Sequence, residues 1–193
     1  MSSDKTPPRF AGPPEDELTE DQRAIRQEIL QSRPRTGLSG PFGPWIAVPN
    51  IARPAQALGK ACRYGTSLSF LESELVILLT GAKVNSPTEF AIHRGEGLKA
   101  GLSEDTINAI PWAHEFSLAA VKEKVCPLLQ NERQTAMACF AAELLETNTV
   151  SDETYQYTKK VMDGKDSVLV ELTSIVGYYV YVSFTLNVFG ITP

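Results

Sequence analysis

Apolar residues recur every three or four positions along most of the chain, in segments that end at glycine, proline, asparagine or serine. This spacing is typical of amphipathic helices, whereas strands alternate apolar and polar positions, and no such alternation stands out. Serine and asparagine cap helix N-termini and glycine ends helices, so these residues set the expected bounds. The pattern therefore predicts an all-α bundle. The predicted helices cover residues 20–31, 51–65, 71–83, 86–100, 103–110, 114–124, 131–147, 151–164 and 167–188.

The last predicted helix, 167–188, is apolar on most of its faces and is long enough to cross a membrane. Polar residues such as Glu171, Ser183 and Asn187 interrupt it, and no positively charged flank follows. A helix that is apolar on most faces is usually buried on several sides. We therefore expect no membrane contact, and we expect this helix to pack against its own domain and against other subunits.

Two segments are predicted to lack regular helix. Residues 1–18 contain four prolines and mixed charge, which predicts a disordered or extended N-terminal arm before a single domain over 19–193. Residues 32–49 are broken by glycines and prolines and predict a long ordered loop. Loops of this length in a small domain often carry function.

Composition and charge argue against some classes of function and indicate a location. A net charge of −5, with lysines and arginines scattered among acids, argues against nucleic-acid binding. The three cysteines, Cys62, Cys126 and Cys139, lie far apart in the sequence and form no Cys-x-x-Cys motif, so we expect free thiols in a reducing compartment. The first ten residues lack the apolar core of a secretory signal, and a cytoplasmic location is expected.

Candidate chemistry gathers in the predicted helix 86–100. Glu89 and His93 are four residues apart, so on a helix they lie on one face with their Cβ atoms about 5–6 Å apart. A carboxylate beside an imidazole holds its tautomer and raises its basicity, which suits acid–base catalysis. Ser86, Pro87 and Glu89 also fit a structural capping box, with His93 as an ordinary half-buried residue. The residues alone leave both interpretations open.

A second acid, Glu74, lies in the preceding apolar helix. In order and separation, Glu74 and His93 resemble the glutamate and histidine of the carboxymuconolactone decarboxylase and AhpD-like superfamily. In its peroxidase branch a Cys-x-x-Cys pair precedes the histidine, and here Ser86 and Glu89 stand at those two positions. The resemblance covers about 35–191 and includes the segments 40–45, 63–64, 74–78, 101–103 and 177–179, and Asn187.

The resemblance implies an AhpD-like helical bundle that assembles as a homo-oligomer, a trimer or a hexamer. It further implies a cofactor-independent lyase or isomerase of the decarboxylase branch, acting on a small carboxylated or polycarbonyl ring compound. His93, Glu89 and Glu74 are then the catalytic residues. Because serine and glutamate replace the cysteine pair, AhpD-like peroxidase activity is not expected.

Five further residues are candidates for substrate binding. Arg63 suits a carboxylate anchor, because a guanidinium binds carboxylate through two hydrogen bonds, although a structural salt bridge would explain it equally. Ser86 offers a hydroxyl or a helix cap. Trp112, His114 and Tyr179 are candidate pocket residues, with core packing or surface exposure as the alternatives.

A metal site and a purely binding role are the remaining alternatives. Glu89, His93 and His114 could supply ligands, but catalytic zinc usually needs three protein ligands and no His-Glu-x-x-His motif is present, so we expect no metal. A helical oligomer that binds a ligand or partner without reaction is the alternative to an enzyme. The sequence leaves open the substrate, the exact reaction, and a catabolic or biosynthetic role.

Overall fold

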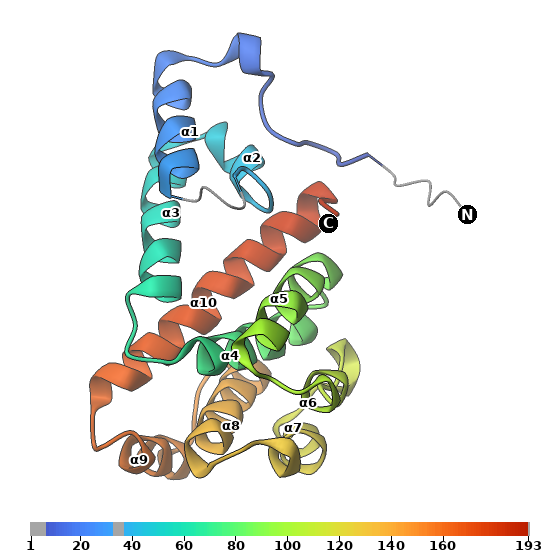
Figure 1. The fold of residues 1–193 in the computed structure, drawn as a ribbon, viewed down its shortest axis with the longest axis vertical. Coiled ribbons are helices and arrows are strands. Elements are labelled where there is room, and N and C mark those ends of the chain that lie inside the picture. Colours follow the sequence, from blue (N-terminus) through green and yellow to red (C-terminus); the bar gives the residue numbers. More distant parts are fainter. Residues whose placement is uncertain (1–6, 33–36, 193) are drawn as a thin grey trace.

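The structure is a computed structural model that describes residues 7–32 and 37–192 (Figure 1). Over these ranges the chain forms helices and no strands, which confirms the predicted all-α class. The α-helices are α1 (Glu20–Ser32), α2 (Phe42–Ile46), α3 (Pro49–Tyr64), α4 (Phe70–Lys83), α5 (Pro87–Ala100), α6 (Glu104–Asn108), α7 (Leu118–Lys124), α8 (Glu132–Thr147), α9 (Asp152–Val161) and α10 (Asp166–Phe189). Three short 3-10 helices are η1 (Glu15–Glu17), η2 (Ala113–Glu115) and η3 (Cys126–Leu128).

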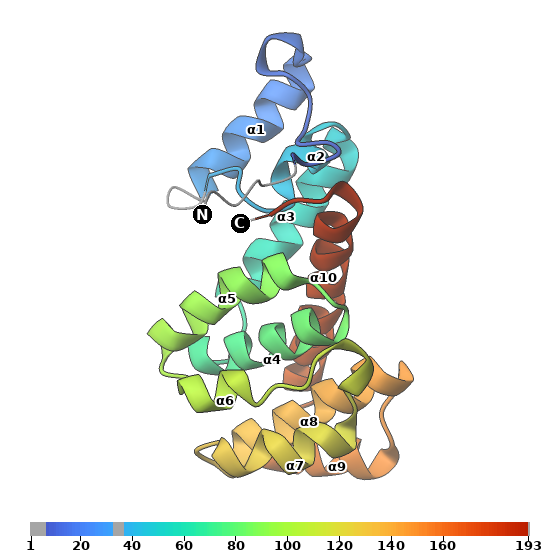
Figure 2. The same ribbon diagram turned by 90° about the vertical axis from the view of Figure 1, so that its right-hand side faces the viewer.

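Helix α10 runs through the molecule and contacts α3, α4, α5, α8 and α9 (Figures 1 and 2). Helices α1–α3 lie toward its C-terminal end, and α7–α9 lie toward its N-terminal end. Helix α4 packs against α5, α8 and α10 and is buried continuously from Glu72 to Ala82. Two acids of this buried stretch, Glu72 and Glu74, therefore need partners inside the protein.

The capping box predicted at the start of α5 is absent. Ser86 occupies the N-cap position but makes no side-chain cap hydrogen bond. The capping box instead begins α4, where the Ser69 hydroxyl accepts from the Glu72 N–H and the Glu72 carboxylate accepts from the Ser69 N–H at 2.8 Å. The prediction was wrong because the Glu89 carboxylate is turned toward His93. The predicted end of α5 at Gly101 is confirmed, with a left-handed φ of 104°.

Two predicted segments differ in detail. The stretch expected to be a loop contains α2, whose Trp45 donates from Nε1 to Thr185 Oγ1 at 3.1 Å and stacks on Tyr181 at 4.9 Å. The helix predicted over 114–124 is divided into η2 and α7. Ala113 has a φ of 47°, outside helical geometry, and Ser117 caps a new helix by accepting from the Ala120 N–H.

The described part of the N-terminal arm lies against the end of α10. The Arg9 N–H donates to the Phe189 carbonyl at 2.8 Å, and the Phe10 and Phe189 rings lie 5.8 Å apart. Gly12 passes so close to Gly43 that an added Cβ would lie 2.5 Å from the Gly43 carbonyl oxygen. These contacts attach the described arm to α2 and α10.

Among the described residues, α10 has the length and apolar character of a membrane span, and 56% of its most apolar window is buried inside the protein. Its inward face supplies core residues, including Leu172, Ile175 and Leu186. Its outward face exposes Val170, Tyr181, Phe184 and Val188.

Candidate active site

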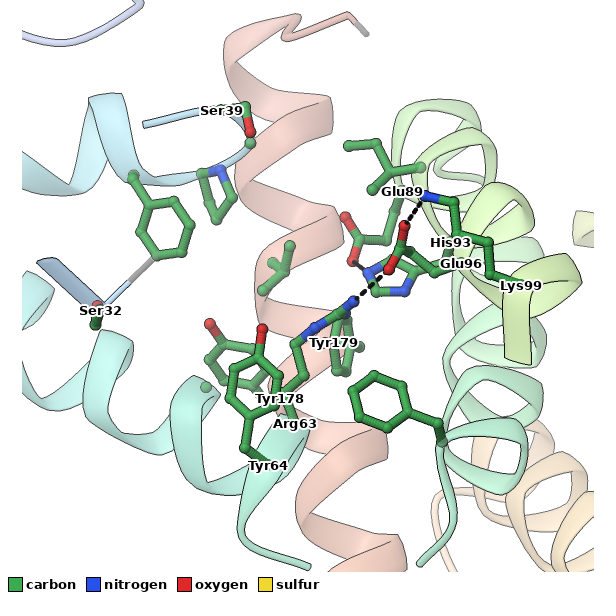
Figure 3. A pocket seen from close by; sticks show the side chains of 17 residues that line it. Ser32, Ser39, Arg63, Tyr64, Glu89, His93, Glu96, Lys99, Tyr178 and Tyr179 are labelled. Atoms are coloured by element: carbon green, nitrogen blue, oxygen red, sulfur yellow. Dashed lines mark hydrogen bonds and ion pairs between the residues drawn. The ribbon is translucent and has the colours of Figure 1, made fainter. Parts of the chain in front are cut away.

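Four helices bring the candidate site together. Arg63 comes from the end of α3, Glu74 from α4, Glu89 and His93 from α5, and Tyr179 from α10. All of these residues except Glu74 line a pocket that lies over α10, between α3 and α5 (Figure 3). The structure thus unites the three predicted catalytic residues with two of the five predicted substrate-binding residues.

The His93 imidazole is held on both of its ring nitrogens. Nδ1 lies 2.6 Å from Glu74 Oε2, and Nε2 lies 3.0 Å from Glu89 Oε1. The three side chains are at most 5% exposed. The Tyr179 ring meets the imidazole edge to face at 5.1 Å between centroids. Because a carboxylate accepts at each nitrogen, this arrangement favours the doubly protonated imidazolium.

The charge of His93 follows from two opposing effects. Burial disfavours the imidazolium, but the hydrogen bonds to Glu74 and Glu89 outweigh burial and raise the pKa of His93 to about 9. At neutral pH His93 is therefore protonated and has no free lone pair. Of the three hydrogen-bonded residues Glu74, His93 and Glu89, it is Glu89, which lines the pocket, that can take a proton from a bound molecule.

Arg63 completes an alternating row of charges. Its Nη1 lies 3.4 Å from Glu74 Oε1 and its Nη2 lies 3.3 Å from Glu96 Oε2, so Glu74 is shared between Arg63 and His93. Burial opposes the guanidinium charge, but Tyr179 and Glu74 outweigh it and raise the pKa of Arg63. Arg63 therefore forms a structural salt bridge, which was the alternative to a role as a carboxylate anchor. It also lines the pocket.

The pocket has a volume of about 580 Å³, in the range of small-molecule sites. Its polar lining consists of Ser32, Ser39, Arg63, Glu89, His93, Glu96 and Lys99. Its apolar and aromatic lining includes Phe42, Tyr64, Phe70, Ile92, Tyr178, Tyr179 and Val182. Gly59 forms part of the wall, and a Cβ added there would lie 2.1 Å from the Tyr178 hydroxyl oxygen. The pocket therefore offers flat apolar walls beside a charged end.

The other three predicted substrate-binding residues lie outside this pocket. Ser86 is fully buried, and its hydroxyl has no hydrogen-bond partner. Trp112 donates from Nε1 to Asn85 Oδ1 at 2.7 Å and packs against Phe90, so it holds the α4–α5 turn. The His114 side chain is 90% exposed, on η2. The structure corrects the predicted placement of all three.

Sequence reasoning missed Glu96 and Lys99, which line the pocket from the same helix as His93. Figure 3 shows Lys99 directed to Glu96, and Glu96 directed to Arg63. The signal was present, because Glu89, His93 and Glu96 follow the i, i+4, i+7 spacing of one helix face. Tyr64 and Phe70 carry no such signal, since their place in the pocket depends on how α3 and α4 meet.

No group of three His, Cys, Asp or Glu side chains in the described ranges is arranged to hold a metal ion. The carboxylates of Glu74 and Glu89 contact opposite nitrogens of one ring, so they diverge instead of converging on one point.

The helix order and packing define an AhpD-like fold, as the resemblance predicted. The chain is similar to the crystal structure of an AhpD core, an uncharacterized peroxidase-related protein from Ralstonia eutropha JMP134. The TM-score is 0.74, with 97% of this chain and 93% of the other covered at 19% identity. No protein-family model matches the chain. No curated protein sequence matches it either. A likeness at this identity establishes the fold and leaves the reaction to be inferred from the site.

Proposed function

We propose that the protein is a cofactor-independent lyase or isomerase that moves a proton on a small carboxylated or polycarbonyl ring compound. The observation that supports this proposal is the buried chain Glu74–His93–Glu89, which ends at a pocket beside Arg63. A carboxylate base next to fixed positive charges suits proton removal from a carbon adjacent to a carbonyl group.

In this mechanism Glu89 is the base. It takes the proton, and the negative charge moves from its carboxylate to the enolate oxygen of the substrate. The His93 imidazolium and the Arg63 guanidinium border the pocket in which that charge develops, so they stabilise it without rearranging. Glu89 then returns the proton at another carbon, which gives isomerisation. Alternatively, Glu89 gives the proton to a hydroxyl group of the substrate, whose bond to carbon breaks as the enolate collapses, so that the group departs as water in a dehydration.

The role of Glu74 is to hold His93 and Arg63 in place. It accepts from both, and its own charge offsets one of the two cations. Arg63, His93 and Lys99 are balanced in charge by Glu74, Glu89 and Glu96, so an anionic substrate would be held by local contacts with Arg63 and Lys99 and not by a net positive charge. Tyr64, Phe70 and Tyr179 provide faces on which a planar ring can pack.

Proton exchange tests the proposal without knowledge of the substrate. The protein is incubated in D₂O with a panel of small cyclic β-keto acids and β-diketones, and loss of the α-proton signal is followed by NMR. We expect catalysed exchange for members of the panel, and a loss of about 10²–10⁴-fold in Glu89→Gln. Glu123→Gln removes an exposed carboxylate on α7 and serves as the matched control.

Two outcomes oppose the proposal. Exchange at the wild-type rate in folded Glu89→Gln excludes this carboxylate as the base. Saturable binding of panel compounds with no exchange supports the non-catalytic, ligand-binding alternative.

The peroxidase alternative is favoured by one finding, the similarity to a peroxidase-related protein. Thiol peroxidase chemistry needs a cysteine beside a base, and the corresponding positions here hold Ser86 and Glu89. We therefore expect the wild-type protein to consume peroxide with a dithiol donor no faster than buffer. Rapid turnover supports a peroxidase.

A further inference from the structure

Two of the three cysteines meet in space, outside the pocket lining. Cys126 Sγ and Cys139 Sγ lie 3.8 Å apart, although the two residues are thirteen positions apart in the sequence. Neither residue lines the pocket, and both are partly exposed. Sequence reasoning treated all three cysteines as isolated thiols, because a separation of this length carries no pairing signal.

The two sulfurs are close enough to be joined by a small movement. A disulfide bond is about 2.05 Å long, so the sulfurs must approach by roughly 1.8 Å. Cys139 lies within the long helix α8 and is fixed. Cys126 begins the three-residue helix η3 between α7 and α8, and a short connector of this kind can adjust more easily than a helix interior.

The surroundings make the two thiols unequal. A hydrogen bond from Cys126 stabilises the Cys139 thiolate against the cost of burial, and Lys122 adds positive charge, so the pKa of Cys139 is lowered despite the opposing charge of Glu143. The hydrogen bond to Cys139 and burial raise the pKa of Cys126. Cys62 is 2% exposed, and burial raises the pKa of its thiol, so it is the least reactive of the three.

We propose that Cys126 and Cys139 form a reversible dithiol–disulfide site that reacts with low-molecular-weight disulfides, with Cys139 as the attacking thiolate. The contact between the two sulfurs, their partial exposure and the adjustable position of Cys126 carry this assignment. The site is independent of the proposed proton-transfer chemistry.

The exchange balances without another reagent. The Cys139 thiolate attacks one sulfur of a disulfide RSSR, forms a mixed disulfide and releases RS⁻. The Cys126 thiolate then attacks the Cys139 sulfur, forms the internal disulfide and releases a second RS⁻. The two cysteine protons pass to the two released thiolates, so the protein dithiol is oxidised while RSSR is reduced to two RSH.

Oxidised glutathione serves as the probe in the test. The full-length protein is equilibrated with it, alkylated, and analysed by intact mass and peptide mapping. We expect the wild-type chain to lose two of its three free thiols and to yield a linked Cys126–Cys139 peptide, with Cys62 still free.

Single variants and early samples of the wild type then test the order of attack. Cys126→Ser keeps the attacking thiolate without its resolving partner, so it should accumulate one glutathione adduct at Cys139. Cys139→Ser removes the neighbour that raises the pKa of Cys126, so it should also acquire one adduct, at Cys126, and form no internal disulfide. In the wild type sampled early, the transient glutathione adduct should lie on Cys139. An absent internal disulfide in the wild type overturns the site, and an early adduct on Cys126 overturns the role given to Cys139.

Discussion

At the scale of single residues, the site is a row of alternating buried charges: Arg63, Glu74, His93 and Glu89. Taking a charge out of water is costly, and each of these groups offsets part of that cost through a partner within hydrogen-bonding or ion-pairing distance. Their charges are therefore interdependent. Removing one acid changes the protonation of the histidine beside it.

The first prediction concerns Glu74. In Glu74→Gln the carboxylate that accepts at His93 Nδ1 is lost, so the pKa of His93 should fall from about 9 by at least about one unit. The Cε1 proton of His93 reports its titration by NMR, and Glu123→Gln should leave the pKa unchanged. An unchanged His93 pKa in folded Glu74→Gln contradicts the pairing seen in the structure.

The second prediction concerns the pH dependence of stability. The pKa of His93 is raised from 6.5 to about 9 in the folded protein. Its stabilising contribution is therefore complete below about pH 6.5 and is lost as the pH rises through about 9. The loss should lower the free energy of unfolding by about 3 kcal/mol in urea titrations across this range. In His93→Gln the free energy of unfolding should lack this pH-dependent loss. Identical pH profiles of the two proteins would contradict the assignment of the loss to His93.

At the scale of elements, local signals located most helices and non-local contacts decided the exceptions. The periodicity and the caps at Ser103, Asn131 and Ser151 are short-range features, and those caps are confirmed. The capping box failed at Ser86 because a longer-range consequence of packing, the burial of His93, drew Glu89 away. The short helix α2 was missed because contacts of Trp45 with α10 stabilise it, and sequence spacing does not reveal them.

The candidate site shows the same difference between local sequence signals and non-local contacts. Glu89 and His93 were found because they share one helix face, whereas Glu74 was found through the family resemblance and through its place in an otherwise apolar helix. Trp112 and His114 were misplaced because aromatic residues in irregular segments carry no periodicity from which their direction can be inferred.

The third prediction compares two N-caps. Ser69→Ala removes the cap hydrogen bond of α4 and should lower the free energy of unfolding by about 1 kcal/mol in urea denaturation. Ser86→Ala is the matched control, because its buried hydroxyl has no partner to lose, and it should be neutral or stabilising. A larger loss for Ser86→Ala than for Ser69→Ala would restore the capping box at α5.

At the scale of the whole molecule, α10 is both the central helix and a surface. Val170, Ser174, Gly177, Tyr181, Phe184 and Val188 follow a three- and four-residue spacing along its outward side. Such spacing is typical of helix–helix seams. The predicted trimer or hexamer would cover this face, and the assembly remains a prediction, as does the cytoplasmic location.

The fourth prediction tests that face. Sedimentation should give three or six times the 21.1 kDa mass of the chain, and Phe184→Glu should give a smaller species, because a charge would be buried in the seam. Leu98→Glu changes an exposed apolar residue on α5 and serves as the control. A monomeric wild-type chain would exclude the predicted assembly.

The contact between Gly59 and Tyr178 has a consequence for which molecules the protein accepts. Because even a methyl group at position 59 would collide with the tyrosine hydroxyl, any larger residue must tilt the ring or push α3 outward. Either adjustment changes the shape of the pocket wall. The range of ligands that the pocket accepts thus depends on the absence of a side chain at Gly59. Position 59 is therefore a place at which selection or engineering would change ligand preference.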